Sequence, residues 1–122
     1  MTNPVSWFEI ASNNLNRSKE FYATVFQSDL QDLDMPEMKL CMFPGDPAGA
    51  GSAGALVQSG QAKPSSEGTI IYFECDDIDE ITKRVESAGG TLLFPKTPVG
   101  DFGFISQFLD PDGNRIGLHS HR

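Results

Sequence analysis

The segment that decides the fold reads NLNRSKEFYATVF and covers residues 14–26. Asn14 or Asn16 can accept a hydrogen bond from the free amides of a helical first turn. The apolar side chains that follow recur at the spacing of one helix face, at Phe21, Tyr22, Val25 and Phe26. The segment therefore predicts a helix from about Asn16 to Phe26 with one buried face.

Strand-like segments surround this helix. The first, residues 6–11, places Phe8 and Ile10 on one face and Trp7 and Glu9 on the other, because side chains alternate along a strand. Three more strands are expected after the helix, over residues 28–34, 37–43 and 54–58. The first half of the chain thus reads as a strand, a helix and three strands.

The same order returns after a polar connection, residues 59–68. A strand is expected over residues 69–75, and Asp77 with Glu80 has the spacing of a capping box that starts a helix. The apolar stripe of this second helix consists of Ile78, Ile81, Val85 and Ala88. Gly89 can end it in a left-handed conformation. Three strands follow again, over residues 91–94, 102–109 and 115–119, with a turn at 110–114 between the last two.

The two cycles can be laid over each other. Asn14 corresponds to Asp77 at an offset of 63 residues (77 − 14), and the same offset places Trp7 on Ile70. We therefore expect one α+β domain, residues 1–122, built from two diverged modules over residues 1–58 and 69–122. Two unrelated α+β halves are the alternative.

The acidic composition limits the class of partner. A formal net charge of −8 argues against a nucleic acid or an anionic membrane, because both need clustered Lys and Arg. No stretch approaches the roughly 20 apolar residues that span a bilayer, and residues 1–10 do not resemble a secretory leader. Cys41 and Cys75 lack metal-binding spacing and predict two buried thiols in a reducing compartment. A cytoplasmic protein is expected.

Four groups of residues carry a resemblance to a known family. They are Asn14-Leu15-Asn16-Arg17-Ser18 with Phe21-Tyr22 and Val25-Phe26, Asp76-Asp77-Ile78-Asp79, Ala88-Gly89-Gly90, and Asp110-Pro111-Asp112-Gly113-Asn114. Along the whole chain the sequence resembles the vicinal oxygen chelate superfamily, which includes glyoxalase, bleomycin resistance proteins and extradiol dioxygenases. The resemblance implies two βαβββ modules whose mixed sheets curl half-open around a cavity, with the helices packed outside, and a homodimer.

In metal-dependent members, the resemblance implies, four ligands come from the first and last strands of both modules. These positions fall on Trp7, Ala55, Ile70 and Gly117, none of which offers a donor to a divalent ion. A one-residue slip in the alignment would place equally unsuitable side chains there, at Phe8, Leu56, Ile71 and Leu118. We expect no metal and no other cofactor.

Alternation along the same strands extends the predicted pocket. Besides the four positions above, its expected lining is Glu9, Val57, Tyr72, Glu74 and His119, with Phe102 and Phe104 from a neighbouring strand. Ala55 and Gly117 would leave room where other members hold an ion. An aromatic pocket with a few polar groups suits a small organic ligand, and the acidic balance favours a neutral or cationic one. The alternative is a vestigial cavity that Trp7 and Tyr72 close.

Glu9 and His119 are the candidate catalytic pair, because the first and last strands can bring a carboxylate beside an imidazole. His121 or Glu74 could instead join them in a displaced metal site. The sequence contains no nucleophile elbow, phosphate-binding loop or dinucleotide fingerprint, and the glycine-rich residues 45–54 are expected to form a mobile rim of the pocket.

Three hypotheses follow for function. The first is a metal-free protein that binds a small organic molecule. The second is a lyase, isomerase or dioxygenase with a displaced metal site. The third is a structural dimer with a closed pocket.

Overall fold

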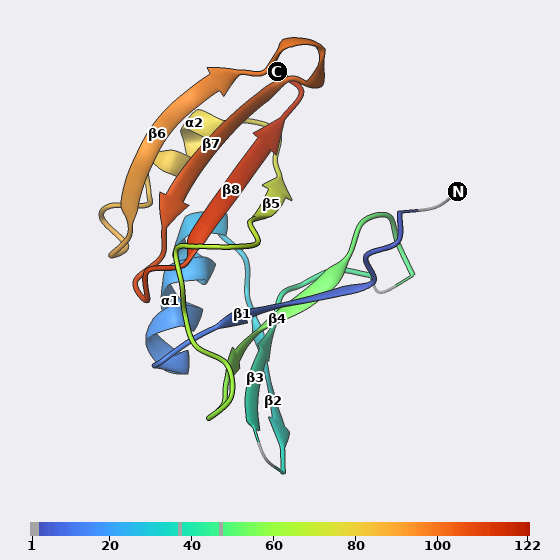
Figure 1. The fold of residues 1–122 in the computed structure, drawn as a ribbon, viewed down its shortest axis with the longest axis vertical. Coiled ribbons are helices and arrows are strands. Elements are labelled where there is room, and N and C mark those ends of the chain that lie inside the picture. Colours follow the sequence, from blue (N-terminus) through green and yellow to red (C-terminus); the bar gives the residue numbers. More distant parts are fainter. Residues whose placement is uncertain (1–2, 37, 47) are drawn as a thin grey trace.

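The computed structural model describes residues 3–36, 38–46 and 48–122. Its elements are, in chain order, β1 (Trp7–Ala11), α1 (Leu15–Phe26), β2 (Gln31–Met35), β3 (Met38–Met42), β4 (Ala53–Gln58), β5 (Ile71–Glu74), α2 (Ile78–Thr82), β6 (Thr91–Pro98), the short 3₁₀ helix η1 (Gly100–Phe102), β7 (Phe104–Leu109) and β8 (Arg115–Ser120). The order of strand, helix and three strands thus occurs twice (Figure 1), which confirms the expected α+β fold class. Glu37, which begins one expected strand, and Pro47 of the glycine-rich loop lie outside the described residues.

The strands form two mixed four-stranded sheets, in the orders β1-β4-β3-β2 and β5-β8-β7-β6. In each sheet the first and last strands of a module pair in parallel, which places Glu9 beside Ala55 and Tyr72 beside Gly117. Glu9 and Tyr72 are equivalent positions in the overlay of the two modules, and so are Ala55 and Gly117. The two halves therefore agree in register as well as in element order.

Helix α1 begins at Leu15, close to the predicted start. Its cap is Asn14, whose side-chain oxygen accepts a hydrogen bond from the Arg17 amide at 3.2 Å. The helix ends at Phe26, after which Gln27 adopts a left-handed conformation with φ 51°. Of the two asparagines considered as caps, the structure thus selects Asn14.

Helix α2 is shorter than its apolar stripe. Asp77 caps it by accepting from the Asp79 amide at 3.0 Å, whereas Glu80 pairs with Lys83 at 2.7 Å instead of closing a capping box. Residues 83–89 continue as turns, in which the Val85 amide bonds to a carbonyl three residues back. Val85 is nevertheless fully buried, so the stripe keeps its packing role beyond the regular helix.

The expected strand over residues 102–109 begins two residues late. Phe102 lies in η1, and Gly103, with φ 98°, separates it from β7. A side chain at position 103 would overlap the Ser120 carbonyl oxygen, so the turn requires glycine. β6, in contrast, runs past its expected end to Pro98, with irregular pairing to β7.

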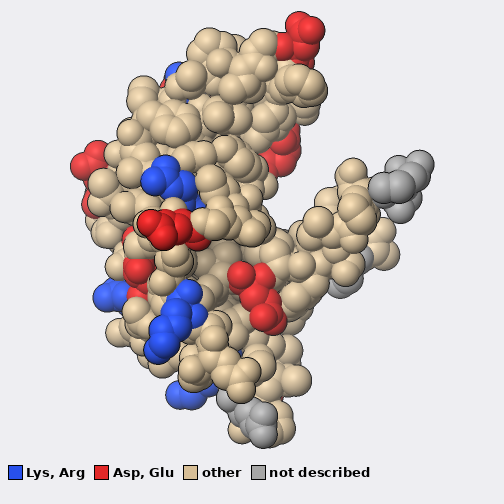
Figure 2. All heavy atoms as spheres, viewed as in Figure 1, with Lys and Arg blue, Asp and Glu red and all other residues tan. Residues whose placement is uncertain are grey.

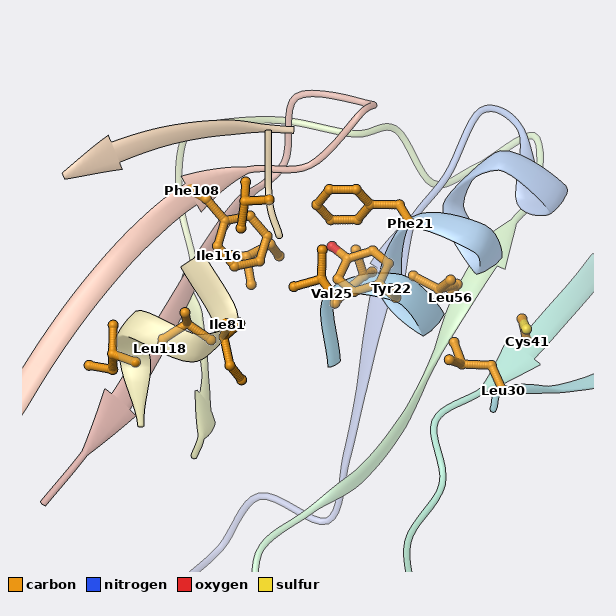
Figure 3. Close-up of a cluster of buried hydrophobic side chains, with 13 residues drawn as sticks. Phe21, Tyr22, Val25, Leu30, Cys41, Leu56, Ile81, Phe108, Ile116 and Leu118 are labelled. Carbon is orange, nitrogen blue, oxygen red and sulfur yellow. The ribbon is translucent and has the colours of Figure 1, made fainter. Parts of the chain in front are cut away.

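The two helices contact each other and lie between the two sheets (Figure 3), so that each sheet turns its other face outward. This arrangement arises because the apolar stripes of α1 and α2 face each other as well as their own sheets, which gives a chain of this size one continuous core. Its buried members are Ile10, Phe21, Tyr22, Val25, Leu30, Cys41, Leu56, Ile78, Ile81, Val85, Phe108, Ile116 and Leu118.

A buried polar network joins the two modules. The Tyr22 hydroxyl donates to Asp110 Oδ2 at 2.7 Å, and Asn114 Nδ2 donates to the same carboxylate at 2.9 Å and to the Ala11 carbonyl at 2.7 Å. Burial raises the pKa of Asp110, although these hydrogen bonds act to lower it. Burial, and then the nearby Asp110 carboxylate, raise the pKa of Tyr22. The turn 110–114, one carrier of the family resemblance, thus holds the N-terminal module to the C-terminal one.

On the face shown in Figure 2, Lys and Arg side chains are interspersed with acidic ones and form no basic patch. Among the described residues, no helix is long and apolar enough to cross a membrane.

Candidate binding face on the second sheet

The four positions at which related proteins would hold a metal lie on the outward faces of the sheets or beside them. Trp7 and Ala55 belong to β1 and β4, Gly117 belongs to β8, and Ile70 immediately precedes β5. Because the helices and core separate the two sheets, these side chains do not converge within one chain. They also carry no ligand atom, so the residues present do not fit a metal ion at this position.

The space beside Gly117 is filled by an aromatic ring. A Cβ atom at position 117 would overlap the ring of Tyr72, which lies across the glycine from the paired strand. Ala55 is fully buried and packs with Leu40 and Val57. The room that the small residues were expected to leave is therefore taken by side chains of the protein itself.

The Tyr72 ring is held by two residues that the sequence analysis missed. Gln107 Nε2 donates to the Tyr72 hydroxyl at 2.6 Å, and Arg115 donates through Nη1 to Gln107 Oε1 at 3.0 Å. Gln107 on β7 pairs with Gly117 on β8, and paired residues share one face of a sheet. Extending the predicted pocket from β8 to β7 could therefore have identified Gln107. Phe104, which was predicted to line the pocket, packs against the core, with Lys96 Nζ 4.5 Å from its ring centre.

His119 lies next along the same outward face. Its Nδ1 is 2.6 Å from Glu74 Oε1, and its Nε2 is 2.5 Å from the Phe102 carbonyl oxygen. Both partners are acceptors, so only the protonated imidazolium, with two N–H donors, satisfies both contacts. These hydrogen bonds, that to Glu74 foremost, raise the pKa of His119.

The expected pair of Glu9 and His119 is not formed. Glu9 accepts a hydrogen bond from Trp7 Nε1 at 3.2 Å on the first sheet, and the carboxylate beside His119 is that of Glu74. Register places Glu74 beside His119 and is a property of the folded sheet, so the sequence did not identify this contact. A catalytic role for Glu9 and His119 stays a prediction.

Glu74, His119 and His121 do come together. Each offers a possible ligand atom, and these atoms lie within 4.8 Å of one another. Glu74 Oε2 is 3.5 Å from His121 Nε2, so one carboxylate faces both histidines of the chain. These three residues are among those predicted for a displaced metal site, and Glu9 is not with them.

A cavity of about 500 Å³ opens between β5 and the first module, within the range of small-molecule sites. Figure 2 shows the surface hollowed between the body and the arm formed by the beginnings of β1 and β4. Three predicted pocket residues line the cavity: Ile70, Tyr72 and Glu74. Phe8, Phe43 and Phe73 add an aromatic wall, and residues of the glycine-rich loop form one side.

The remaining predicted residues divide between other places. Glu9 and Val57 border a second cavity, of about 370 Å³, beneath the connection between the modules. Trp7 is 40% exposed on the first sheet, and Phe102 is 78% exposed although its carbonyl oxygen contacts His119. The pocket lining expected as one set is thus distributed over two outward sheet faces and two cavities.

The chain matches known proteins over nearly its full length. Residues 5–118 match the model of the Glyoxalase/Bleomycin resistance protein/Dioxygenase superfamily. The putative glyoxylase CFP32 of Mycobacterium tuberculosis is 26% identical in an alignment of 119 residues that covers 93% of this chain and 44% of CFP32, so the chain spans less than half of that relative. The anthracycline biosynthesis protein DnrV of Streptomyces peucetius is 44% identical over 43 residues, 35% of this chain and 16% of DnrV.

Solved structures agree in fold. A glyoxalase/bleomycin resistance protein from Albidiferax ferrireducens superposes with a TM-score of 0.72 at 19% identity, over 98% of this chain and 100% of that one. TnmS3, an antibiotic-binding protein from Streptomyces sp. CB03234, superposes with a TM-score of 0.68 at 23% identity, over 97% and 95%. With the two βαβββ modules and the family match over residues 5–118, this chain belongs to the Glyoxalase/Bleomycin resistance protein/Dioxygenase superfamily.

Proposed function

We propose that the chain binds a small, partly aromatic molecule without a metal ion at the position used by metal-dependent relatives. One observation carries the proposal: all four positions lack a ligand atom, and the Tyr72 ring covers one of them, Gly117. A protein that offers no ligand atom at these four positions but has an aromatic cavity beside one of the same strands is suited to binding rather than to metal chemistry there.

The lining of the cavity indicates the class of ligand. Its aromatic wall suits a planar molecule, and Asp46 and Glu74 contribute carboxylates to its lining. None of the described residues that line it is Lys or Arg, so a neutral or cationic ligand is favoured over an anion. The names of DnrV and TnmS3, an anthracycline biosynthesis protein and an antibiotic-binding protein, are in line with a polycyclic ligand.

Two measurements on the protein purified without chelators test this function. We expect far less than one transition-metal ion per chain by elemental analysis, and a rise in melting temperature with planar aromatic compounds, because a ligand that binds only the folded state stabilises it. Nearly one metal ion per chain would contradict the proposal.

The second candidate function is metal-dependent lyase, isomerase or dioxygenase chemistry at Glu74, His119 and His121, favoured by the convergence of their ligand atoms. An ion there would have to displace the proton that His119 shares with Glu74. Metal that is present in the wild type and lost in His121→Ala would favour this candidate.

The third candidate is a dimer with a closed pocket. If no aromatic compound raised the melting temperature, and Trp7→Ala only lowered stability, this candidate would replace the first.

Two further parts of the proposal concern the assembly and the location. We propose a homodimer, because the first sheet exposes apolar side chains that a second copy could cover, namely Trp7, Leu33, Met35 and Met38. Light scattering during size-exclusion chromatography tests it. A cytoplasmic location is in line with Cys41 and Cys75, both free thiols.

A further inference from the structure

The side chains Arg115, Gln107 and Tyr72 form a relay whose donor directions are determined. Arg115 has only N–H donors, so the Gln107 amide must turn its oxygen toward Arg115 and its nitrogen toward Tyr72. The Gln107 nitrogen therefore donates to the Tyr72 hydroxyl oxygen. A hydroxyl that accepts this bond must direct its own proton elsewhere.

The two tyrosines of the chain differ in this respect. The Tyr22 hydroxyl proton is donated to Asp110, inside the core. Among residues 3–36, 38–46 and 48–122, no acceptor faces the Tyr72 hydroxyl proton, and Tyr72 is 41% exposed. The hydroxyl proton of Tyr72 is thus available to a molecule from outside.

The relay also strengthens this hydroxyl as a donor. Arg115 withdraws electron density from the Gln107 amide, and the amide in turn polarises the phenol, since hydrogen bonds in a chain reinforce one another. Arg115 is held in place by a further bond from its Nε to the Ser66 carbonyl at 3.2 Å. The positive end of the relay is therefore anchored, and the donor end is open.

We propose that the Tyr72 hydroxyl donates a hydrogen bond to an oxygen atom of the ligand, a carbonyl or quinone oxygen on an aromatic ring system. The inference rests on the proposed function and names the ligand chemistry. Tyr72 borders the aromatic cavity at β5, and its ring reaches across Gly117 to Gln107 of β7. The polarised hydroxyl therefore lies on the outward face of the second sheet, beside the position where metal-dependent relatives would offer an ion to a ligand oxygen.

A pair of matched probes tests this inference. 2-(Aminomethyl)anthraquinone and 2-(aminomethyl)anthracene share a planar ring system and a cationic amine, but only the first carries acceptor oxygens. Titration calorimetry with the wild type is expected to give tighter binding of the quinone. Tyr72→Phe should weaken quinone binding about tenfold and leave anthracene binding unchanged, as expected for the loss of one hydrogen bond.

Gln107→Glu tests the direction of the relay with the phenol in place. The introduced carboxylate would accept both from Arg115 and from Tyr72, so the hydroxyl proton would turn inward. We expect the same tenfold loss for the quinone in this variant. Tyr22→Phe is the matched control, because it removes a tyrosine hydroxyl whose proton is already used, and quinone affinity should not change. Thermal unfolding of each variant confirms that it is folded.

The outcomes separate this inference from the proposed function. If both probes bind and neither Tyr72→Phe nor Gln107→Glu changes their affinity, the inference is overturned and the proposed function stands. Equal losses for both probes would also overturn it, since ring contact alone would then explain the effect. If the wild type binds neither probe, the proposed function is contradicted and the inference falls with it.

Discussion

The molecule contains two polar networks, each centred on a tyrosine, and they differ in burial and in the role expected of them. At the junction of the modules, Tyr22 and Asn114 direct their donors to the buried Asp110. On the outward face of the second sheet, Gln107 holds Tyr72, and no residue that the structure describes accepts the Tyr72 hydroxyl proton. A buried network must satisfy its polar groups because water cannot, whereas a half-exposed one can keep a donor for a ligand. The first network should therefore determine stability and the second should determine binding.

The largest effect is expected from Asp110→Ala. The substitution leaves the Tyr22 hydroxyl and the Asn114 amide without their acceptor in the core, which should cost about 3 kcal/mol of unfolding free energy. Urea denaturation measures the loss. A cost below about 1 kcal/mol would mean that the turn 110–114 does not hold the modules together.

Tyr22→Phe compared with Tyr72→Phe tests the contrast directly. Tyr22→Phe removes one hydrogen bond to a buried carboxylate and should cost about 2 kcal/mol. Tyr72→Phe, on a half-exposed side chain, should stay within about 0.5 kcal/mol of the wild type. If both variants lost equal stability by urea denaturation, the two networks would share one structural role.

Gly117→Ala tests the second network at the glycine that the Tyr72 ring covers. Its Cβ would push the Tyr72 ring off the strand and break the bond to Gln107, at an expected cost of about 1 kcal/mol, because the exposed ring can move away. The double variant with Tyr72→Ala should recover most of that cost, and a double-mutant cycle measures the coupling. Additive losses would show that the ring does not depend on the glycine.

The smallest effect concerns pH. The pKa of His119 is raised in the folded state, so its contribution to stability is fully present below the unfolded value of about 6.5 and is lost as pH rises through the raised value. The stability difference between the wild type and His119→Gln should be below about 1 kcal/mol at pH 6, because Glu74 is largely exposed, and should shrink as the pH is raised. A difference that grew with pH would contradict the protonated pair, and Glu74→Gln is the control that removes its partner.

Much of the fold could be predicted from local patterns. The asparagine and aspartate caps, the apolar stripes of both helices and the alternation in β1 were readable because each depends on residues a few positions apart. The predictions were wrong where the local structure depends on contacts between segments that are far apart in the sequence. Regular α2 ends at Thr82, and Gly103 removes Phe102 from the strand because the chain must clear the Ser120 carbonyl.

The candidate site was harder to predict for the same reason. The absence of ligand atoms at Trp7, Ala55, Ile70 and Gly117 could be predicted, since side-chain chemistry does not depend on packing. The hydrogen-bond partners of His119 and Tyr72 could not be predicted. Glu74 rather than Glu9 faces His119, and Gln107 holds Tyr72, because strand order and register bring them together from 45 and 35 residues away.

By itself, then, the sequence determined two similar modules, their order of elements and a family site without metal ligands, because these follow from side-chain identity and short-range spacing. Only the tertiary structure decided that the helices lie between the sheets and that the Tyr72 ring fills the space beside Gly117. Those outcomes depend on which apolar faces meet when one core closes, and that choice involves the whole chain at once.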